Sequence, residues 1–261
     1  MNQFEDKTFL IKINQLFARE NISVKIGFEQ EFYYSGDIED IRQLYHELSF
    51  EDEQGEEQYE AITEAGFDII NICNQIEALR ANKELNFSAK ISPNLPGSAL
   101  NLSVSLWRDG RNLLSKLPNS ADSRYLLWAV SGLEDFANDL IYLYAKTSEA
   151  YERIRCGGNH TATKICWGYN NRSAAFRIPT TDESLIRIEN RIIAADSDPL
   201  AATCATLYSI YHGIKNKLDI NHKIYGDSAH EQYQLIRLID NLEEAKDRFE
   251  IWISQNDKVL V

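Results

Sequence analysis

The ten residues "KIGFEQEFYY", numbers 25–34, constrain the fold more than any other stretch of the chain. Isoleucine, phenylalanine and tyrosine favour β-strands, and side chains two positions apart in a strand point to the same face. Glu29 and Glu31 are therefore neighbours on one face of a predicted strand, although like charges repel. A bound divalent cation would offset that repulsion, because hard cations take carboxylate oxygens as ligands. The alternative is an edge strand whose charged face is turned to water.

Length and charge bound the kind of protein. The 261 residues suffice for a single domain, 1–261, with its own hydrophobic core. A net charge of -13 argues against a nucleic-acid partner, since phosphate contacts need clustered lysine and arginine. The N-terminal "MNQFEDKTFL" lacks a basic and apolar signal segment, and no apolar run is long enough to span a bilayer. We therefore expect no membrane partner and a cytoplasmic protein.

The cysteines and histidines do not follow metal-binding or disulfide patterns. The four cysteines, Cys73, Cys156, Cys166 and Cys204, include no CxxC pair, so neither a zinc site nor a disulfide framework is predicted. The five histidines show no HxH or HxxxH spacing. We expect free thiols, as in a reducing compartment.

Hydrophobic periodicity predicts a mixed α+β domain. Apolar residues recur three and four positions apart, as in helices, over 3–21, 37–48, 67–85, 122–154, 198–218 and 229–254. Strands are predicted within 22–34, 86–93, 94–107, 161–168, 169–179 and 183–193. The acid-rich stretch 49–65 is interrupted by Gly55 and receives no assignment. The strands carry charge on one face, and the helices are expected to cover the other.

Charged residues recur on several predicted strands. They are Glu29 and Glu31, then Arg172 and Arg177, then Arg187, Glu189 and Arg191. Together they predict an open sheet with a polar concave face, on which acids bind metal and arginines bind phosphate or carboxylate oxygens. If the stretch "RIENR" is considered alone, its charged residues could instead form salt bridges with neighbouring strands and bind no ligand.

Several motifs then point to one family. "GFEQEF", "WGYNNRSAAFRIP", "RIENR" and "GIKNK" occur in the order found in the catalytic domain of glutamine synthetase, which the chain resembles from about residue 24 to its C-terminal helices. "EQGEEQYE", "GSALNLSVSLW" and "AYERI" fit the same order. The resemblance implies a curved, mostly antiparallel sheet with a polar face that binds metal and ATP, backed by helices. It also implies a ligase that uses ATP and Mg²⁺ or Mn²⁺ to phosphorylate a γ-glutamyl carboxylate, then transfers the acyl group to ammonia or another amine.

The resemblance assigns roles to particular residues. Glu31, Glu53 and Glu60 match the ligands of the ion on the glutamate side, and Glu29 and Glu189, with Asn101, match those of the ion on the phosphate side. Arg153 matches the arginine that binds the glutamate carboxylate. Arg172 and Arg177 match arginines near the transferred phosphoryl group and the nucleotide, and Arg191 matches the catalytic arginine that closes the arginine-bearing strand. Ser173 and Arg187 are assigned with Arg172 and Arg177 to the nucleotide.

Other positions depart from the family pattern. Asn101 and Ser103 stand in the stretch where the family has metal-binding histidine, and an amide oxygen is a weaker, neutral donor. Pro96 replaces an asparagine of the glutamate-binding loop, and Ser184 a lysine near the nucleotide. Asn159 stands where the family has a glutamate in the flap, a loop that covers the active site. An asparagine side chain cannot accept a proton there. His160 beside it could act as a base, although a loop histidine is more often inert.

Three hypotheses remain open. The first is the ligase. The second is a catalytically weak or inactive relative that binds ATP or metal as a regulator or partner subunit, which Asn101, Pro96 and Asn159 favour. The third is an interaction module, in which neutralising Glu31, Glu53 and Glu60 would only relieve repulsion. Because about 24 residues precede the first strand, we also expect the family's N-terminal β-grasp domain to be absent. We expect either a homo-oligomer or a partner that supplies the missing β-grasp domain.

Overall fold

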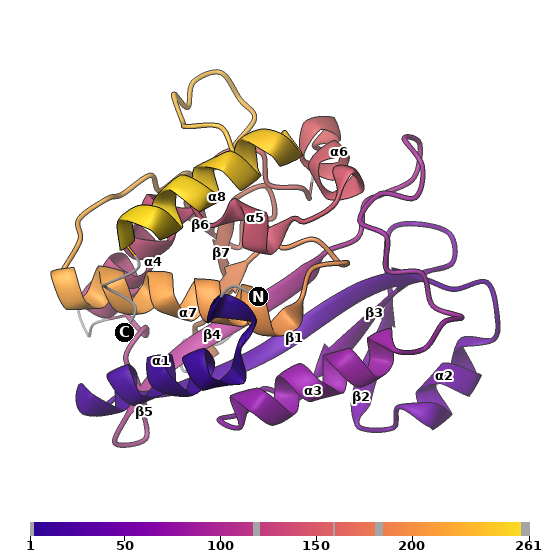
Figure 1. Ribbon diagram of the computed structural model, residues 1–261, viewed down its shortest axis with the longest axis horizontal. Coiled ribbons are helices and arrows are strands. Elements are labelled where there is room, and N and C mark those ends of the chain that lie inside the picture. The colour runs from indigo at the N-terminus through magenta and orange to yellow at the C-terminus, as the bar shows by residue number, and fades with distance from the viewer. Residues whose placement is uncertain (1–2, 117–120, 159, 181–184, 257–261) are drawn as a thin grey trace.

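The computed structural model describes residues 3–116, 121–158, 160–180 and 185–256. Its centre is an eight-stranded sheet, and helices α1, α3 and α7 cross one face of it (Figure 1). The strands are β1 (Ser23–Tyr33), β2 (Leu48–Asp52), β3 (Gln58–Thr63), β4 (Leu100–Arg108), β5 (Arg111–Asn112), β6 (Trp167–Tyr169), β7 (Phe176–Ile178) and β8 (Ile188–Asn190).

The strand order is β2-β3-β1-β4-β8-β7-β6, with β5 paired to β4. All pairs are antiparallel except β6 with β7, which confirms the predicted α+β class with a mostly antiparallel sheet. Because β1 lies between β3 and β4, the interpretation of 25–34 as an edge strand is wrong.

The sheet separates apolar from polar side chains. Along β4, Leu100, Leu102 and Val104 pack in the main hydrophobic core, and they alternate with Asn101 and Ser103. Strand β1 follows the same pattern: Val24, Ile26 and Phe28 belong to the core, and Glu29 and Glu31 belong to the polar face. Period-two alternation therefore positions the candidate site opposite the helices.

Most of the described helices begin at a residue whose side-chain oxygen accepts a hydrogen bond from the first turn. They are α1 (Lys7–Arg19), α2 (Ile38–Leu44), α3 (Ile69–Arg80), α4 (Arg124–Phe136), α5 (Ile141–Tyr144), α6 (Ser148–Cys156), α7 (Pro199–Asn216) and α8 (Leu242–Asn256), with a short 3-10 helix at Gln3–Glu5. The N-caps are Asp6, Asp37, Asp68, Ser123, Thr147 and Asp198.

The single helix predicted over 122–154 is three helices. The chain leaves the helical path after α4 because the Asn138 side chain donates to the Arg237 carbonyl and accepts from the Ile239 amide. Thr147 then caps α6. Tertiary hydrogen bonds thus override a continuous amphipathic pattern.

Other predicted elements are shorter or absent. Residues 86–93 form one bridge, Asn86 with Tyr33, and no strand, because the Asn86 side chain accepts from the Ser88 amide in a turn. The predicted strand 161–168 is limited to its end, β6. Residues 229–241 are not helical, since Ile236 and Leu238 pair with the backbone of 163–165. The unassigned stretch 49–65 contains the hairpin of β2 and β3.

Helices α4 and α7 pack with their backbones almost in contact. A Cβ added to Gly132 would lie 2.0 Å from the Ser209 carbonyl oxygen, and one added to Gly213 would lie 2.1 Å from that of Trp128. Only glycine fits at either position. The four cysteines are free thiols, as predicted. Among the described helices, none combines the length and apolarity needed to cross a bilayer.

Candidate active site

A cavity of about 360 Å³ lies over the polar face of the sheet. Most residues singled out from the sequence line it: Glu29, Glu31, Glu53, Glu60, Asn101, Arg153, Arg172, Arg177, Arg187 and Arg191. They come from four strands, from α6 and from connecting loops. Residues separated by more than 150 positions in the chain thus form one site.

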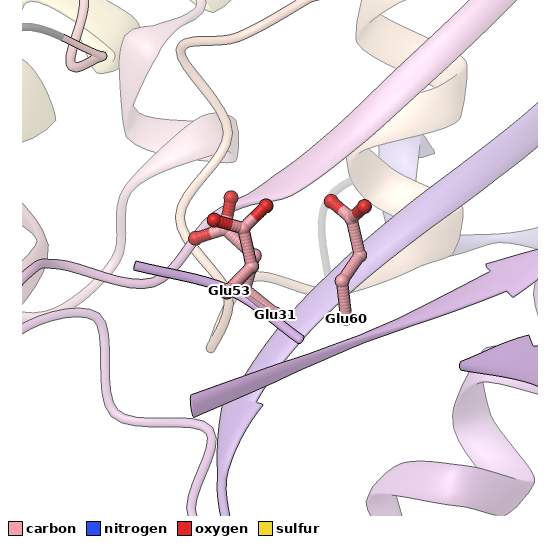
Figure 2. A group of neighbouring side chains, drawn as sticks. All are labelled: Glu31, Glu53 and Glu60. Atoms are coloured by element: carbon pink, nitrogen blue, oxygen red, sulfur yellow. The ribbon is translucent and has the colours of Figure 1, made fainter. Parts of the chain in front are cut away.

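Three of the acids that line this cavity form a compact group. Glu31 lies on β1, Glu60 on β3, and Glu53 in the turn between β2 and β3. Their carboxylate oxygens lie within 4.8 Å of one another, and the three side chains point to the same side of the sheet (Figure 2). Among the described residues, no other set of three or more histidine, cysteine, aspartate or glutamate side chains meets this spacing. The donor set is the one hard divalent cations take.

Burial makes Glu31 and Glu60 difficult to ionise. It raises the pKa of Glu60 to about 9, with Glu29 and Glu31 adding repulsion, and it raises the pKa of Glu31 to about 7. Arg153 opposes the rise at Glu31, and the Ala99 amide donates to Glu31 Oε2 over 2.8 Å. A cation among the three carboxylates would favour their charged forms.

Glu29 lies beside the acid group, next to an unpaired amide. Glu29 on β1 pairs in register with Asn101 on β4. Asn101 is 2% exposed, and its Oδ1 has no hydrogen-bond partner. Burial, followed by the nearby Glu189 charge, raises the pKa of Glu29. A buried acceptor without a donor is costly unless something binds it, so Glu29 and Asn101 fit a second cation.

Glu189 is embedded among arginines. It does not line the cavity and is fully buried, with Oε2 accepting from Arg177 Nη1 at 2.7 Å and Oε1 from Arg191 Nη1. Arg177 and Glu189 are a cross-strand pair on β7 and β8, so the salt-bridge interpretation of "RIENR" is correct for this residue. A carboxylate has about four lone-pair sites, so these bonds leave room for an ion, and the role of Glu189 as a ligand stays a prediction.

Arg153 is held by backbone carbonyls. It is 4% exposed and donates to the carbonyls of Ile192 and Arg191 at 3.3 and 3.4 Å. Burial lowers its pKa, and the Glu31 charge opposes this. This buried guanidinium beside the acids suits a carboxylate ligand.

The predicted nucleotide residues lie in different places. Arg187 lines the main cavity and a neighbouring one of about 320 Å³, and it donates to Ser103 Oγ over 3.2 Å. Ser173 lines a third cavity, where its Oγ donates to Asn171 Oδ1 and accepts from the Ser228 amide. Ser173 therefore fixes a turn, and its contact with a nucleotide stays a prediction.

The sequence analysis missed several residues that line the cavity, among them Glu51, Gln58 and Lys90. Gln58 is 2% exposed, accepts from the Gly55 amide and donates to the Gly97 carbonyl and to Ser98 Oγ. It thereby connects the Glu53 turn to the loop before β4. The alternation in "QYEAIT" could have indicated strand β3 and the inward position of Gln58.

The departures from the family pattern also lie at the cavity. Pro96 lines it, and the Pro96 carbonyl accepts from Tyr33 Oη over 3.0 Å. His160 lines it too. Asn159 and Ser184 lie outside the described residues.

Comparison with known proteins identifies the family. The profile described as the glutamine synthetase catalytic domain matches residues 71–254, more than half of the chain. The chain belongs to the glutamine synthetase family. A solved glutamine synthetase of Plasmodium falciparum superposes with a TM-score of 0.77 at 17% identity, covering 94% of this chain and 70% of that one. At that identity the likeness shows the glutamine synthetase fold alone.

Two relatives of the glutamine synthetase family are named for amines other than ammonia. Gamma-glutamylputrescine synthetase of Escherichia coli is 30% identical over 147 residues, which are 56% of this chain and 31% of that protein. Glutamate–isopropylamine ligase of a Pseudomonas species is 29% identical over 197 residues, 74% of this chain and 43% of that protein. The chain therefore matches less than half the length of these relatives.

Proposed function

We propose that the protein is an ATP- and divalent-metal-dependent carboxylate–amine ligase that activates the γ-carboxylate of a glutamate-like acid and transfers it to ammonia or another amine. The observation that carries the proposal is the single cavity in which Glu31, Glu53 and Glu60 face Arg153 and the other arginines. A carboxylate is a poor electrophile, so the reaction needs phosphorylation before an amine can attack.

The arginines of the cavity would take two roles. Arg153, beside Glu31, would bind a carboxylate of the amino acid by paired hydrogen bonds. Arg172 and Arg177 would neutralise the oxygens of the transferred phosphoryl group. Phosphoryl transfer depends mainly on positioning and on such neutralisation.

The neighbouring cavity offers space for the nucleoside of ATP. It shares Glu29 and Arg187 with the main cavity, and its lining includes the apolar side chains of Ile62 and Trp107. A purine base could pack on these apolar side chains while its phosphates extend past Arg187. ATP is thus proposed as the cosubstrate bound across both cavities.

The side chains fit Mg²⁺ or Mn²⁺ as well. Glu31, Glu53 and Glu60 would hold one ion, and Glu29, Asn101 and Glu189 the other. Bound there, the ions supply charge neutralisation at the phosphate and carboxylate oxygens.

A second candidate function is a relative that binds ATP or metal without turnover. Asn101 favours it, because a neutral amide is a weaker donor than an imidazole. Pro96 favours it too, since its nitrogen cannot donate a hydrogen bond to an amino-acid substrate.

The test is phosphate release from ATP by the purified protein with Mg²⁺ or Mn²⁺. It is run with and without glutamate, across ammonium, isopropylamine and putrescine, beside the double variant Glu31→Gln/Glu60→Gln. Release that requires glutamate and disappears in the variant supports the ligase, and the best amine names the product. A metal-dependent thermal shift with ATP but no release supports the second candidate.

The proposal extends to assembly and location. The fold family suggests that a neighbouring chain contributes to the site, so we propose a homo-oligomer or a partner that carries a β-grasp domain. Light scattering on the purified protein measures whether it forms a homo-oligomer. Four free thiols support the cytoplasm as its location.

A further inference from the structure

Gln58, the first residue of β3, connects two parts of the cavity wall. Its carbonyl accepts from the Glu53 amide and its Oε1 accepts from the Gly55 amide, both over 2.9 Å. Its Nε2 donates to the Gly97 carbonyl over 3.2 Å and to Ser98 Oγ over 3.1 Å. One buried side chain thus joins the turn that carries Glu53 to the loop before β4.

That loop contacts groups with different proposed ligands. A Cβ added to Gly97 would lie 2.8 Å from Arg153 Cγ and 3.0 Å from Arg153 Cδ, so the Gly97 backbone packs directly on the Arg153 side chain. Two residues later, the Ala99 amide donates to Glu31 Oε2 over 2.8 Å. A displacement of the loop would therefore change the packing of Arg153, which is proposed to bind the amino-acid carboxylate.

Glu53 is the acid whose position depends most on a turn. Glu31 and Glu60 are paired residues of neighbouring strands, so the sheet fixes their backbones. Glu53 lies between β2 and β3, in a turn that closes through the hydrogen bonds to Gln58. Three carboxylates can share one cation only if the turn presents Glu53 at the right place, and Gln58 holds the turn there.

We propose that Gln58 is a positioning residue that couples cation binding by the three acids to amino-acid binding at Arg153; this inference rests on the proposed function. A fixed Glu53 turn fixes the Gln58 amide, and that amide fixes the Gly97 backbone against Arg153. Coupling between two sites is reciprocal, so glutamate and Mn²⁺ should each tighten the binding of the other by the same factor. Direct attraction between their charges also couples them, but it does not require Gln58.

The test is calorimetric titration of Mn²⁺ without ATP, with and without saturating glutamate, into the wild type and Gln58→Met. Methionine has a similar length but makes none of the side-chain hydrogen bonds. The wild type should bind Mn²⁺ about 10-fold more tightly when glutamate is present, within the usual range for coupled sites. Gln58→Met should lose most of this factor. A wild-type affinity that glutamate leaves unchanged, or a factor that Gln58→Met retains, would overturn the inference.

Steady-state turnover gives a second readout. In Gln58→Met at saturating Mn²⁺, the glutamate KM should rise by about 10-fold and kcat should change much less, because the acids and arginines of the cavity are all present. A residue that only stabilised the fold would lower the amount of active protein and leave KM unchanged. An unchanged KM would therefore contradict a positioning role.

Control variants separate coupling from folding. Ser131→Ala loses buried hydrogen bonds between α4 and the Ile220 backbone, outside the cavity, and should keep the coupling. If it loses the coupling, lower stability is the cause and the role of Gln58 is refuted. If Gln58→Met does not fold, Gln58→Glu replaces it, since an ionised glutamate still accepts from the Gly55 amide but cannot donate to Gly97. The coupling factor is a ratio within one variant, so the added charge affects both of its affinities.

The outcomes also distinguish this inference from the proposed function. A wild type that binds Mn²⁺ and glutamate with coupling, but releases no phosphate with any amine, would reject the ligase and retain the role of Gln58. Phosphate release that requires glutamate, without coupling in the wild type, would retain the ligase and reject the role of Gln58. A wild type that binds neither would reject both.

Discussion

Glu31 of β1 and Glu60 of β3 stand directly opposite each other in the sheet, and both side chains line the same cavity. Like charges at directly opposed positions destabilise a sheet. Burial alone would favour protonation of such a pair, and a shared cation would permit ionisation instead. The stability of the fold should therefore depend on the protonation of this pair and on any cation bound to it. Both dependences can be measured.

Glu60→Gln should stabilise the metal-free protein and abolish its response to metal. In EDTA at pH 8, the folded wild type holds a proton on Glu60 at a cost in free energy, and glutamine removes that cost, so Tm should rise by about 2–4 °C for each kcal/mol removed. Wild type should gain stability on adding Mn²⁺, about 2.7 kcal/mol at a hundred times Kd, and the variant should not. Thermal melts measure both effects, and the exposed Glu47→Gln is the control. If the variant responds to Mn²⁺ as wild type does, Glu60 is not a ligand.

The metal-free protein should lose stability as pH rises from about 5 to 9. An unfolded glutamate ionises near 4.5, whereas the folded Glu60 holds its proton to a pKa of about 9. Between these values the folded chain binds more protons, so the free energy of unfolding falls with rising pH. Glu31 adds the same trend up to its pKa of about 7.

Metal should reverse that trend, because its affinity rises as the carboxylates lose their protons. Thermal melts at pH 5, 7 and 9, with EDTA or with Mn²⁺, measure how stability changes with pH in the metal-free and the metal-bound protein. Glu134 lies outside the cavity, and burial raises its pKa to about 8, so it also contributes to the pH dependence of stability in EDTA. The difference between wild type and Glu60→Gln isolates Glu60, and identical slopes would contradict its raised pKa.

The sequence identifies the individual acids and arginines of the candidate site, but it does not predict all the contacts that they make in the fold. Glu29, Arg177 and Glu189 could be placed on a polar sheet face because strand alternation decides which face each side chain occupies, and the family resemblance then implied their roles. The salt bridging of "RIENR" was anticipated, but the choice of Arg177 on β7 as the cross-strand partner of Glu189 depends on three-dimensional packing. The unpaired Asn101 oxygen depends on packing as well, and spacing predicts neither.

In the fold, too, local sequence patterns predict some elements, and long-range contacts determine others. Long periodic segments such as α1 and α7 were predicted correctly. Residues 122–154 were not, since Asn138 turns the chain away from a helix by bonding to residues about a hundred positions later. Residues 229–241 pair with 163–165 for the same kind of reason. Local pattern fails where distant hydrogen bonds determine the backbone path.

Arg172→Ala should lower turnover far more than it lowers stability. The Arg172 side chain is exposed at the cavity, so its removal costs little packing, but a charge facing the transferred phosphoryl group is lost. We expect a decrease in kcat of about 100-fold with an unchanged Tm. Steady-state phosphate release and a thermal melt measure the two quantities, with Arg19→Ala in α1 as the control. Unchanged turnover would remove Arg172 from the site.

Arg177→Ala should lower both turnover and stability. Its guanidinium pairs with the fully buried Glu189, so removal leaves that carboxylate with Arg191 as its remaining ion-pair partner. Breaking a buried pair typically costs about 3–5 kcal/mol. Denaturant unfolding of Arg177→Ala beside Arg177→Lys tests this, because lysine retains the charge. A variant as stable as wild type would mean that Glu189 is protonated or otherwise paired.

Gly132→Ala should destabilise the whole domain. The added Cβ meets the Ser209 carbonyl oxygen, a backbone atom that cannot move aside without separating α4 from α7. Overpacking of this kind costs about 1–3 kcal/mol or more. Urea unfolding followed by circular dichroism gives the value. Gly226→Ala is the control, because its Cβ would lie 3.5 Å from Tyr233 Oη, an ordinary contact. Equal stability of the two variants would refute the close helix crossing.

Asn101→His should strengthen the binding of Mn²⁺ more than that of Mg²⁺. The Asn101 oxygen is buried, unpaired and opposite Glu29, so the side chain at this position faces the second proposed ion. Imidazole suits transition metals better than an amide does, whereas Mg²⁺ prefers oxygen. Calorimetric titration of both ions into wild type and variant measures the change in the ratio of the two affinities. Asn101→Ala, which removes the donor, should weaken both ions. If neither substitution alters either affinity, the second ion does not contact this strand, and the unpaired amide has another cause.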